Sequence, residues 1–249
     1  MLKIESQYVF IMCPNHSGST VLYFLINTSN EVSTMNHHGS IIEGQIVPEA
    51  MKFMPYAKES DLGLFSIYKK LHQDINNYNW KEIKRIWRNN WNCNKSVLLE
   101  KSTTNLYRKN MLENNFYNAK FLIMVRNPYA VCEGIRRKHN VDVSLAIDHW
   151  IDTAETQINN ISSNSLFFTY EKLCDDTDLI VNQILCFIPS LKNLDYKKKL
   201  FRPRYENLVG LQNMNQEQIK RLSYNEIITI SNKLKKRNDI VKFYGYEIL

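Results

Sequence analysis

The sequence has no long hydrophobic run that would indicate a membrane protein. No stretch of its 249 residues approaches the roughly 20 apolar residues that a membrane-spanning helix needs. The amino-terminal segment contains Glu5, Ser6 and Gln7 and has no small-residue cleavage site, which is typical of a first strand rather than a signal peptide. We therefore expect a cytoplasmic protein with no membrane partner.

Cysteine is also scarce, and its distribution excludes two common structural roles. The five cysteines are odd in number and scattered, and none lies two or three residues from another. This pattern argues against both a disulfide framework and a zinc site. The His, Asp and Glu residues show no recurrent ligand spacing, so no metal is implied. We expect most of the thiols to be reduced core residues, with Cys13 near the site.

The composition indicates a globular chain with a basic balance. Hydrophobic residues make up 44% of the chain and charged residues 23%, which argues against disorder. There is no internal repeat or linker-like stretch, so we expect residues 1–249 to form a single domain. The net charge of +7 suits an anionic ligand, but nucleic-acid-binding proteins have the same balance. Charge alone therefore does not define the partner.

Short apolar runs alternate with helical patterns along the chain. The apolar runs predict strands at Tyr8–Met12, Ser96–Leu99, Lys120–Val125 and Ser165–Thr169. Helices are expected over 20–27, 64–92, from Pro128 onward, and over 144–161, 177–188, 215–221 and 224–236. The mixed composition of 30–65 predicts a long loop with short helices. This alternation indicates an α/β fold whose parallel sheet binds ligands outside the carboxyl ends of its strands.

The segment CPNHSGS after the first strand has the composition of an anion-binding loop. A strand, a loop of small residues and a helix start present unpaired N–H groups and the helix dipole to one ligand. Gly18 lets the backbone approach closely, and Ser17, Ser19 and Thr20 add hydroxyl donors. An ordinary strand-to-helix turn is the alternative. Ser19 stands where nucleoside triphosphatases have the P-loop lysine, and no Asp follows a buried strand, so a kinase fits poorly.

Four segments of the chain resemble motifs of sulfotransferases that use 3′-phosphoadenosine 5′-phosphosulfate (PAPS). PNHSGSTVLYFLI resembles the family's 5′-phosphosulfate loop, and FLIMVRNPYAVCEGIRRK resembles its 3′-phosphate motif. LLEKSTTN is similar to the EKSP segment of bacterial, tyrosylprotein- and carbohydrate-type members, and FFTYEKL to the family's RYEDL. The matches follow the family's order, and the ending KFYGYEIL also resembles a family terminus. The resemblance implies a P-loop-like three-layer sandwich with a central parallel sheet.

The resemblance also implies roles for individual residues. The 5′-phosphosulfate would lie against the loop, the 3′-phosphate against Arg126 and the adenosine against Tyr170; the loop residues are His16, Ser17, Gly18, Ser19 and Thr20. The sequence departs from the family twice, because His16 replaces a loop Arg or Lys and Gly134 replaces a Ser. Gly134 could offer its backbone N–H to the 3′-phosphate. Further cationic candidates, or else a solvated helix face, are Arg136, Arg137, Lys138, Arg202 and Arg204.

Three residues are candidates for the chemistry. Lys101 would stabilise the transferring group, and His16 would assist the leaving phosphate. We expect His16 to be cationic there, because nearby anionic oxygens raise the pKa of an imidazole. Glu43 is the favoured general base, with His37 and His38 as competitors. The alternative is that Glu43 caps a helix and the two histidines are exposed.

The predicted function is transfer of a sulfuryl group from PAPS to a hydroxyl or amine, which releases adenosine 3′,5′-bisphosphate. The acceptor would be a small molecule such as a secondary metabolite, or a carbohydrate, chosen by the segments 30–95 and 139–160. Trp80, Trp87 and Trp91 either line the acceptor site or belong to the core. We expect no nucleic-acid partner. The alternatives are a small-molecule kinase, a basic nucleic-acid-binding module and a sulfotransferase-like protein that binds nucleotide without catalysis.

Overall fold

The computed structural model describes residues 6–37, 40–41, 43–54, 78–197 and 211–249. Among the sequence predictions, the first part of the 64–92 helix and the candidates His38, Arg202 and Arg204 lie outside the described residues. The side chain of His37 is likewise not described.

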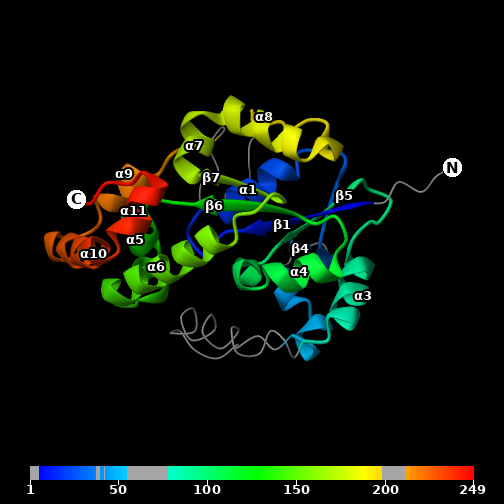
Figure 1. Cartoon of the computed structure of the whole chain (residues 1–249), viewed down its shortest axis with the longest axis horizontal. Helices are drawn as coiled ribbons and strands as arrows, with labels where there is room; N and C mark the ends of the chain where they lie inside the picture. The colour runs from blue at the N-terminus through cyan, green and yellow to red at the C-terminus, as the bar shows by residue number, and fades with distance from the viewer. Residues whose placement is uncertain (1–5, 38–39, 42, 55–77, 198–210) are drawn as a thin grey trace.

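A parallel sheet of five strands forms the centre of the molecule (Figure 1). Its strands are β1 (Gln7–Met12), β2 (Val32–Thr34), β5 (Val97–Lys101), β6 (Lys120–Val125) and β7 (Ser165–Thr169), in the order β2-β5-β1-β6-β7. Ile11 of β1 pairs with Lys101, and Met12 pairs with Ile123 of β6. This register brings the ends of β1, β5 and β6 to one edge of the sheet, as the sequence predicted.

The helices keep the predicted alternation with the strands, although those over 109–115, 170–175 and 238–244 were not predicted. They are α1 (Ser19–Ile26), α3 (Trp80–Asn90), α4 (Lys109–Asn115), α5 (Pro128–His139), α6 (Val143–Asn159), α7 (Tyr170–Asp175), α8 (Thr177–Phe187), α9 (Asn215–Ile219), α10 (Tyr224–Lys236) and α11 (Asn238–Tyr244). Asn127 caps α5, because its side chain accepts hydrogen bonds from the amides of Tyr129 and Ala130. A capping box of Ser223 and Glu226 starts α10 at the predicted residue.

The segment expected to be a long loop, 30–65, contains more regular structure than predicted. It holds β2, a small antiparallel hairpin of β3 (Asn36–His37) and β4 (Ser40–Ile41), and two 3₁₀ turns, η1 (Gly44–Ile46) and η2 (Ala50–Lys52). Two further 3₁₀ turns are η4 (Thr103–Tyr107) and η5 (Pro189–Leu191). The strand β2 is stabilised by pairing with β5 rather than by its own three residues, which show no usable period.

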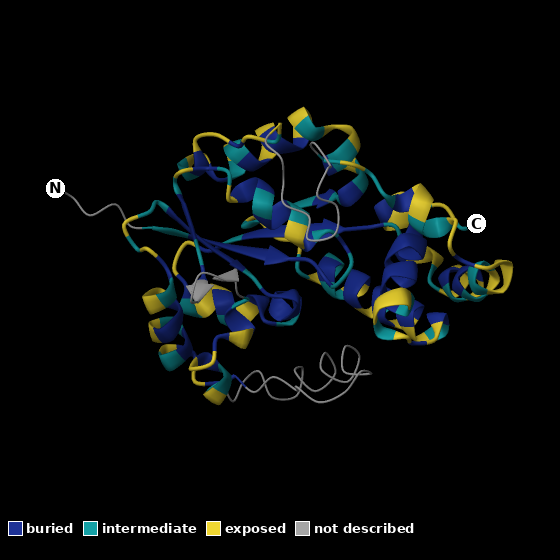
Figure 2. Ribbon diagram, turned by 180° about the vertical axis from the view of Figure 1, so that it is seen from behind, coloured by how far each residue is buried: buried dark blue, intermediate teal, exposed yellow. Residues whose placement is uncertain are grey.

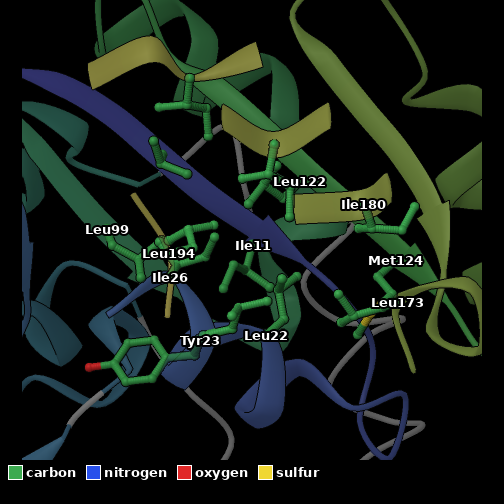
Figure 3. Close-up of a cluster of buried hydrophobic side chains, with 14 of the residues drawn as sticks. Ile11, Leu22, Tyr23, Ile26, Leu99, Leu122, Met124, Leu173, Ile180 and Leu194 are labelled. Atoms are coloured by element: carbon green, nitrogen blue, oxygen red, sulfur yellow. The ribbon is translucent and has the colours of Figure 1, made fainter. Parts of the chain in front are cut away.

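Alternating residues of β1 pack against opposite helical layers. Phe10 and Met12 face a cluster with α3 and α4, whereas Val9 and Ile11 face a cluster with α1 and α8. Figure 3 shows the second cluster, in which Ile11 and Leu122 of the sheet meet Leu22 and Ile26 of α1. Two helical layers around one sheet confirm the predicted three-layer α/β sandwich.

The aromatic stripe at Trp80, Trp87 and Trp91 belongs to the core. All three side chains are buried in the cluster beneath the sheet, and Trp87 stacks on Phe116 at 5.7 Å between ring centroids. The alternative that they line an acceptor site is therefore wrong. Their indole N–H groups are also used inside the protein: Trp87 donates to the carbonyl of Gly44, and Trp91 donates to that of Leu99.

A third cluster joins α5, α6, α10 and α11 around Trp150. Figure 1 shows these helices gathered at the end of the sheet toward which the strands run. In the burial view of Figure 2 the strands and the inner faces of the helices are dark blue. Within the described ranges, no helix combines the length and the apolar character needed to cross a membrane.

Candidate functional site

The loop between β1 and α1 leaves several backbone amides without a partner. Gly18 precedes α1 in the left-handed conformation, with φ 92°. In the described part of the chain, the N–H groups of Gly18, Ser19 and Thr20 make no hydrogen bond to the protein. The hydroxyl of Ser17 is used within the loop, where it donates to the carbonyl of Pro14. Three free amides at a helix N-terminus fit an anionic oxygen.

Tyr170, the first residue of α7, packs directly against this loop. A Cβ atom placed on Gly18 would lie only 2.6 Å from Cδ2 of Tyr170, so no other residue fits at position 18. The Tyr170 hydroxyl donates to the carbonyl of Gln212 at 2.7 Å, and its ring lies 4.1 Å from the centre of the Arg126 guanidinium. The sequence-predicted Gly18, Tyr170 and Arg126 are therefore neighbours.

Arg126, which follows β6, is tied to the loop and to α9. Its Nη1 donates to the His16 carbonyl at 3.1 Å, its Nε donates to Oδ1 of Asn215 at 2.8 Å, and its Nη2 donates to Oε1 of Gln218. A guanidinium has five N–H donors, so two remain for a ligand. Burial lowers the pKa of Arg126 from its ordinary value, which is high enough for the group to stay charged. Arg126 can therefore bind a phosphate group through its two remaining N–H donors.

Two carboxylates hold the α9 amides against Arg126. Glu171 accepts from Nδ2 of Asn215 at 2.5 Å and from the Tyr246 hydroxyl at 2.9 Å. Glu133, which is fully buried, accepts from Nε2 of Gln218 at 3.1 Å. Burial, and secondarily the charge of Glu171, raises the pKa of Tyr246 well above its ordinary value, so this hydroxyl stays a donor. The carboxyl-terminal segment thus supports the site from behind.

One contact explains both departures from the sulfotransferase motifs. The imidazole of His16 packs onto α5, and a Cβ atom on Gly134 would lie 2.9 Å from its Nδ1. A serine at 134 would occupy the space that the ring fills. Nε2 of His16 also lies 3.3 Å from Nε2 of His139, so one imidazole donates and the other accepts. The imidazole of His16 therefore requires a residue without a side chain at position 134.

His16 is neutral in the ligand-free protein. Burial, together with the nearby charges of Lys138 and His139, lowers its pKa from 6.5 to about 3. Burial and the surrounding positive charges disfavour protonation in this state. The expectation that His16 is cationic refers to the state with anionic donor oxygens beside it, and it stays a prediction.

Lys101 and Glu43 form an ion pair at the end of β5. Nζ of Lys101 contacts Oε1 of Glu43, and the side chains are 15% and 24% exposed, so a solute can reach both. Lys101 is the register partner of Ile11, one residue from the end of β1, which places the pair beside the loop. Glu43 stands at the start of η1 but makes no capping hydrogen bond, so the helix-cap alternative is wrong.

The remaining cationic candidates divide into paired and unpaired groups. Arg136 interacts with Glu226 and with the Arg221 carbonyl, and Arg137 pairs with the buried Glu133. Lys138 is exposed and makes no ion pair with the described residues. This lysine directly precedes His139 on α5, and His139 is the residue whose imidazole contacts that of His16.

Cysteine chemistry plays no part in the described site. All five cysteines are free thiols, and burial raises the pKa of Cys13 to about 12, which keeps this loop residue uncharged. Among the residues that the structure describes, no three His, Cys, Asp or Glu side chains are grouped as metal ligands would be.

The site contains residues that sequence reasoning did not select. Glu171 lies within the motif FFTYEKL, so its place was signalled although its role was not. Asn215 and Gln218 carried no signal, because an amide in a short polar helix is ordinary surface composition. Gln45, next but one to Glu43, was quoted within the segment EGQ yet received no role.

Comparison with known proteins gives the fold to which the chain is similar. No protein-family model and no curated protein sequence matches the chain. Among solved structures, the sulfotransferase domain of the Synechococcus PCC 7002 olefin synthase has a TM-score of 0.62 at 16% identity, with 99% of this chain and 97% of that chain covered. The sulfotransferase domain from the curacin biosynthetic pathway has a TM-score of 0.56 at 17% identity, with 98% and 99% covered.

A third neighbour is the sulfotransferase STF9 from Mycobacterium avium, with a TM-score of 0.54 at 10% identity, covering 98% of this chain and 78% of that chain. These likenesses extend over nearly the whole of the first two neighbours. The chain therefore has the fold of sulfotransferase domains, which confirms the predicted fold class.

Proposed function

We propose that the protein is a sulfotransferase that moves a sulfuryl group from PAPS to a hydroxyl or amine of a small molecule or carbohydrate. The observation that carries the proposal is the arrangement at the carboxyl edge of the sheet. Three free amides lie at the N-terminus of α1, Arg126 is hydrogen-bonded to the same loop, and the Lys101–Glu43 pair lies at the neighbouring strand end. The reaction needs a binding site for each of the two phosphate groups of the donor, and it needs an acid–base pair. The loop amides, the Arg126 guanidinium and the Lys101–Glu43 pair would supply these parts.

The donor-binding residues divide the work by charge and shape. The amides of Gly18, Ser19 and Thr20 would hold the 5′-phosphosulfate, and the two free donors of Arg126 would hold the 3′-phosphate. Tyr170, between them, would contact the adenosine edge. His16 would assist the leaving phosphate from the loop, and the backbone of Gly134 lies against its imidazole.

The bound donor supplies an activated sulfuryl group, and the residues of this chain stabilise charge and accept a proton. Lys101 has three N–H donors and uses one on Glu43, so the others can face the transferring group. Glu43 would take the proton of the acceptor hydroxyl or amine. A positioned acid–base group contributes about 10²–10⁴-fold in rate, so the pair would carry much of the catalysis.

A small-molecule acceptor is the favoured class. Two of the structural neighbours are domains of an olefin synthase and of the curacin biosynthetic pathway, which make small molecules. A kinase is disfavoured, because Ser19 occupies the position of the P-loop lysine and Arg126 occupies the strand end where a magnesium ligand would stand.

The proposal is tested first by binding and then by transfer. We expect calorimetry to show that adenosine 3′,5′-bisphosphate binds at least tenfold more tightly than AMP or ATP, because only it engages both Arg126 and the α1 amides. A screen with ³⁵S-labelled PAPS over phenols, aliphatic alcohols, amines and sugars should then identify an acceptor. Lys101→Ala should lower turnover at least 100-fold and leave nucleotide affinity within about twofold.

Lys172→Ala is the matched control, since this lysine lies near Tyr170 on the exposed side of α7 and, among the described residues, forms its ion pair with Asp176. Equal affinity for ATP and the bisphosphate would contradict the proposed donor. Unchanged turnover in Lys101→Ala would remove that residue from the mechanism.

A further inference from the structure

Gln45 is a buried amide that contacts the candidate base. Its side chain is 2% exposed, and its Nε2 donates to Oε2 of Glu43 at 2.5 Å. The other carboxylate oxygen of Glu43, Oε1, accepts from Lys101. Both oxygens of this carboxylate are therefore held by a donor, and the group cannot rotate without breaking one of the two bonds.

Thr104 determines which end of the Gln45 amide faces Glu43. The Thr104 hydroxyl, which is buried, donates to Oε1 of Gln45. With its oxygen occupied by this donor, the amide presents its NH₂ group to the carboxylate. A flipped amide would set two oxygens against each other and leave the buried hydroxyl without an acceptor, and both effects disfavour the flipped state.

The backbone around Gln45 is fixed by the segment that follows β5. The amide of Gly44 donates to Oε1 of the buried Glu100 at 2.8 Å, and the amide of Gln45 donates to the Ser102 hydroxyl at 3.2 Å. A Cβ atom on Gly44 would lie 2.7 Å from the Trp87 ring, so the chain runs close against α3. The segment that carries Glu43 is thereby attached to the strand that carries Lys101.

We propose that Gln45 is a positioning residue that keeps the Glu43 carboxylate oriented beside Lys101, with Thr104 fixing the direction of its amide. A carboxylate has about four lone-pair sites, of which Lys101 and Gln45 use two, so room remains for the acceptor proton. Glu43 and Lys101 belong to the catalytic pair of the proposed function, and this inference rests on that function.

The test compares variants that differ by single contacts. Thr104→Val keeps the shape but removes the hydroxyl, Thr104→Ser keeps the hydroxyl, and Gln45→Leu removes the amide. Thr103→Val is the matched control, because the neighbouring hydroxyl makes no hydrogen bond among the described residues. Each variant is assayed with PAPS and the best acceptor of the screen, and its affinity for adenosine 3′,5′-bisphosphate is measured by calorimetry.

We expect kcat to fall about tenfold or more in Thr104→Val and Gln45→Leu, with nucleotide affinity unchanged, because the base is disturbed and the donor site is not. Thr104→Ser and Thr103→Val should stay within about twofold of the natural protein. A kcat unaffected by both Thr104→Val and Gln45→Leu would overturn the inference while leaving the proposed function intact.

A second readout distinguishes positioning from a loss of structure. Gln45→Glu places a second carboxylate against Glu43, and like charges disfavour ionisation of the pair. The acid limb of the profile of kcat/KM against pH should therefore move to higher pH, and activity should recover as the pH rises. A proportional loss at every pH would overturn the inference. A natural protein that neither binds the bisphosphate nor transfers sulfuryl would overturn both the function and the inference.

Discussion

Gly18 is the residue on which the shape of the candidate donor loop depends. It combines a left-handed backbone with the close approach of the Tyr170 ring, and only glycine satisfies both conditions. The sequence predicted its importance, because a glycine before a helix in a loop of small residues is a local pattern. The partner of that glycine lies some 150 positions away, and no local pattern identifies it.

Replacement of Gly18 by alanine should destabilise the protein by at least about 2 kcal/mol, since a left-handed backbone and an overpacked contact each cost about 1–2 kcal/mol. Gly245→Ala is the control, because Gly245 is also left-handed, at φ 72°, but a Cβ atom there meets nothing within 4 Å. Urea denaturation of both variants measures the difference. Equal losses would show that the Tyr170 contact contributes nothing.

His16 and Gly134 should behave as a coupled pair. In the natural protein Gly134→Ala forces a Cβ atom against the imidazole, and we expect a loss of about 1 kcal/mol despite the better helix propensity of alanine. In the background of His16→Gly the clash is gone, and the same change should stabilise α5 by up to about 1 kcal/mol. A double-mutant cycle measured by denaturation gives the coupling energy. Additive effects would mean that the two positions are independent.

The short helix α9 illustrates how an element can be held by one side chain. Arg126 contacts it through Asn215 and Gln218, and those amides are backed by Glu171 and Glu133. Five residues are too few to form a stable helix in isolation, so α9 depends on this attachment. The Arg126 guanidinium therefore links α9 to the part of the site that would bind the sulfuryl donor.

Removal of that guanidinium should loosen α9. In Arg126→Ala we expect amide hydrogen exchange over 215–219 to become about tenfold faster, because local opening no longer breaks the two hydrogen bonds from Arg126 to Asn215 and Gln218. Affinity for adenosine 3′,5′-bisphosphate should fall by several-fold or more at the same time. Arg237→Ala, which removes exposed ion pairs with Glu155 and Asp239, serves as the control. Unchanged exchange in α9 would show that other contacts hold it.

Helices and strands with a strong hydrophobic periodicity or a clear polar boundary were predictable. Elements that are stabilised by contacts with distant segments were not. The strands Lys120–Val125 and Ser165–Thr169 have the predicted bounds, because each is a short apolar run with polar residues at both ends. The strand β2, with three residues, exists through its pairing with β5. The same limit applies to the site: Lys101 and Glu43 were selected from motifs, whereas Gln45 and Thr104 acquire a role only from contacts across the fold.

At the scale of the whole molecule, buried neutral histidines make stability depend on pH. Burial lowers the pKa of His149 from 6.5 to about 3, as it does for His16. Between about pH 3 and pH 6.5 the two histidines bind protons in the unfolded chain but not in the folded protein. Their contribution to the free energy of unfolding is therefore complete above about pH 6.5 and falls as the pH decreases toward 3. Burial raises the pKa of Glu100, which has the opposite sign and offsets part of the loss at lower pH.

We expect the free energy of unfolding to be lower at pH 5 than at pH 7 by up to about 2 kcal/mol for each fully buried histidine. His149→Gln should remove about half of that difference, because glutamine does not titrate. Urea denaturation of the natural protein and the variant at both pH values provides the measurement. An identical pH dependence in the two proteins would assign the effect to other groups.

The order of strands in the sheet has a consequence for how the protein is made. β1 lies at the centre, yet its two partners, β5 and β6, are encoded far downstream, and α9 later still. During synthesis the apolar run of β1 leaves the ribosome long before anything can pair with it. Non-local parallel pairing of this kind forms slowly and leaves apolar surface exposed until the strands have paired. The nascent chain is therefore expected to need chaperones, and the contacts of Arg126 with α9 form only after residues 215–219 have been translated.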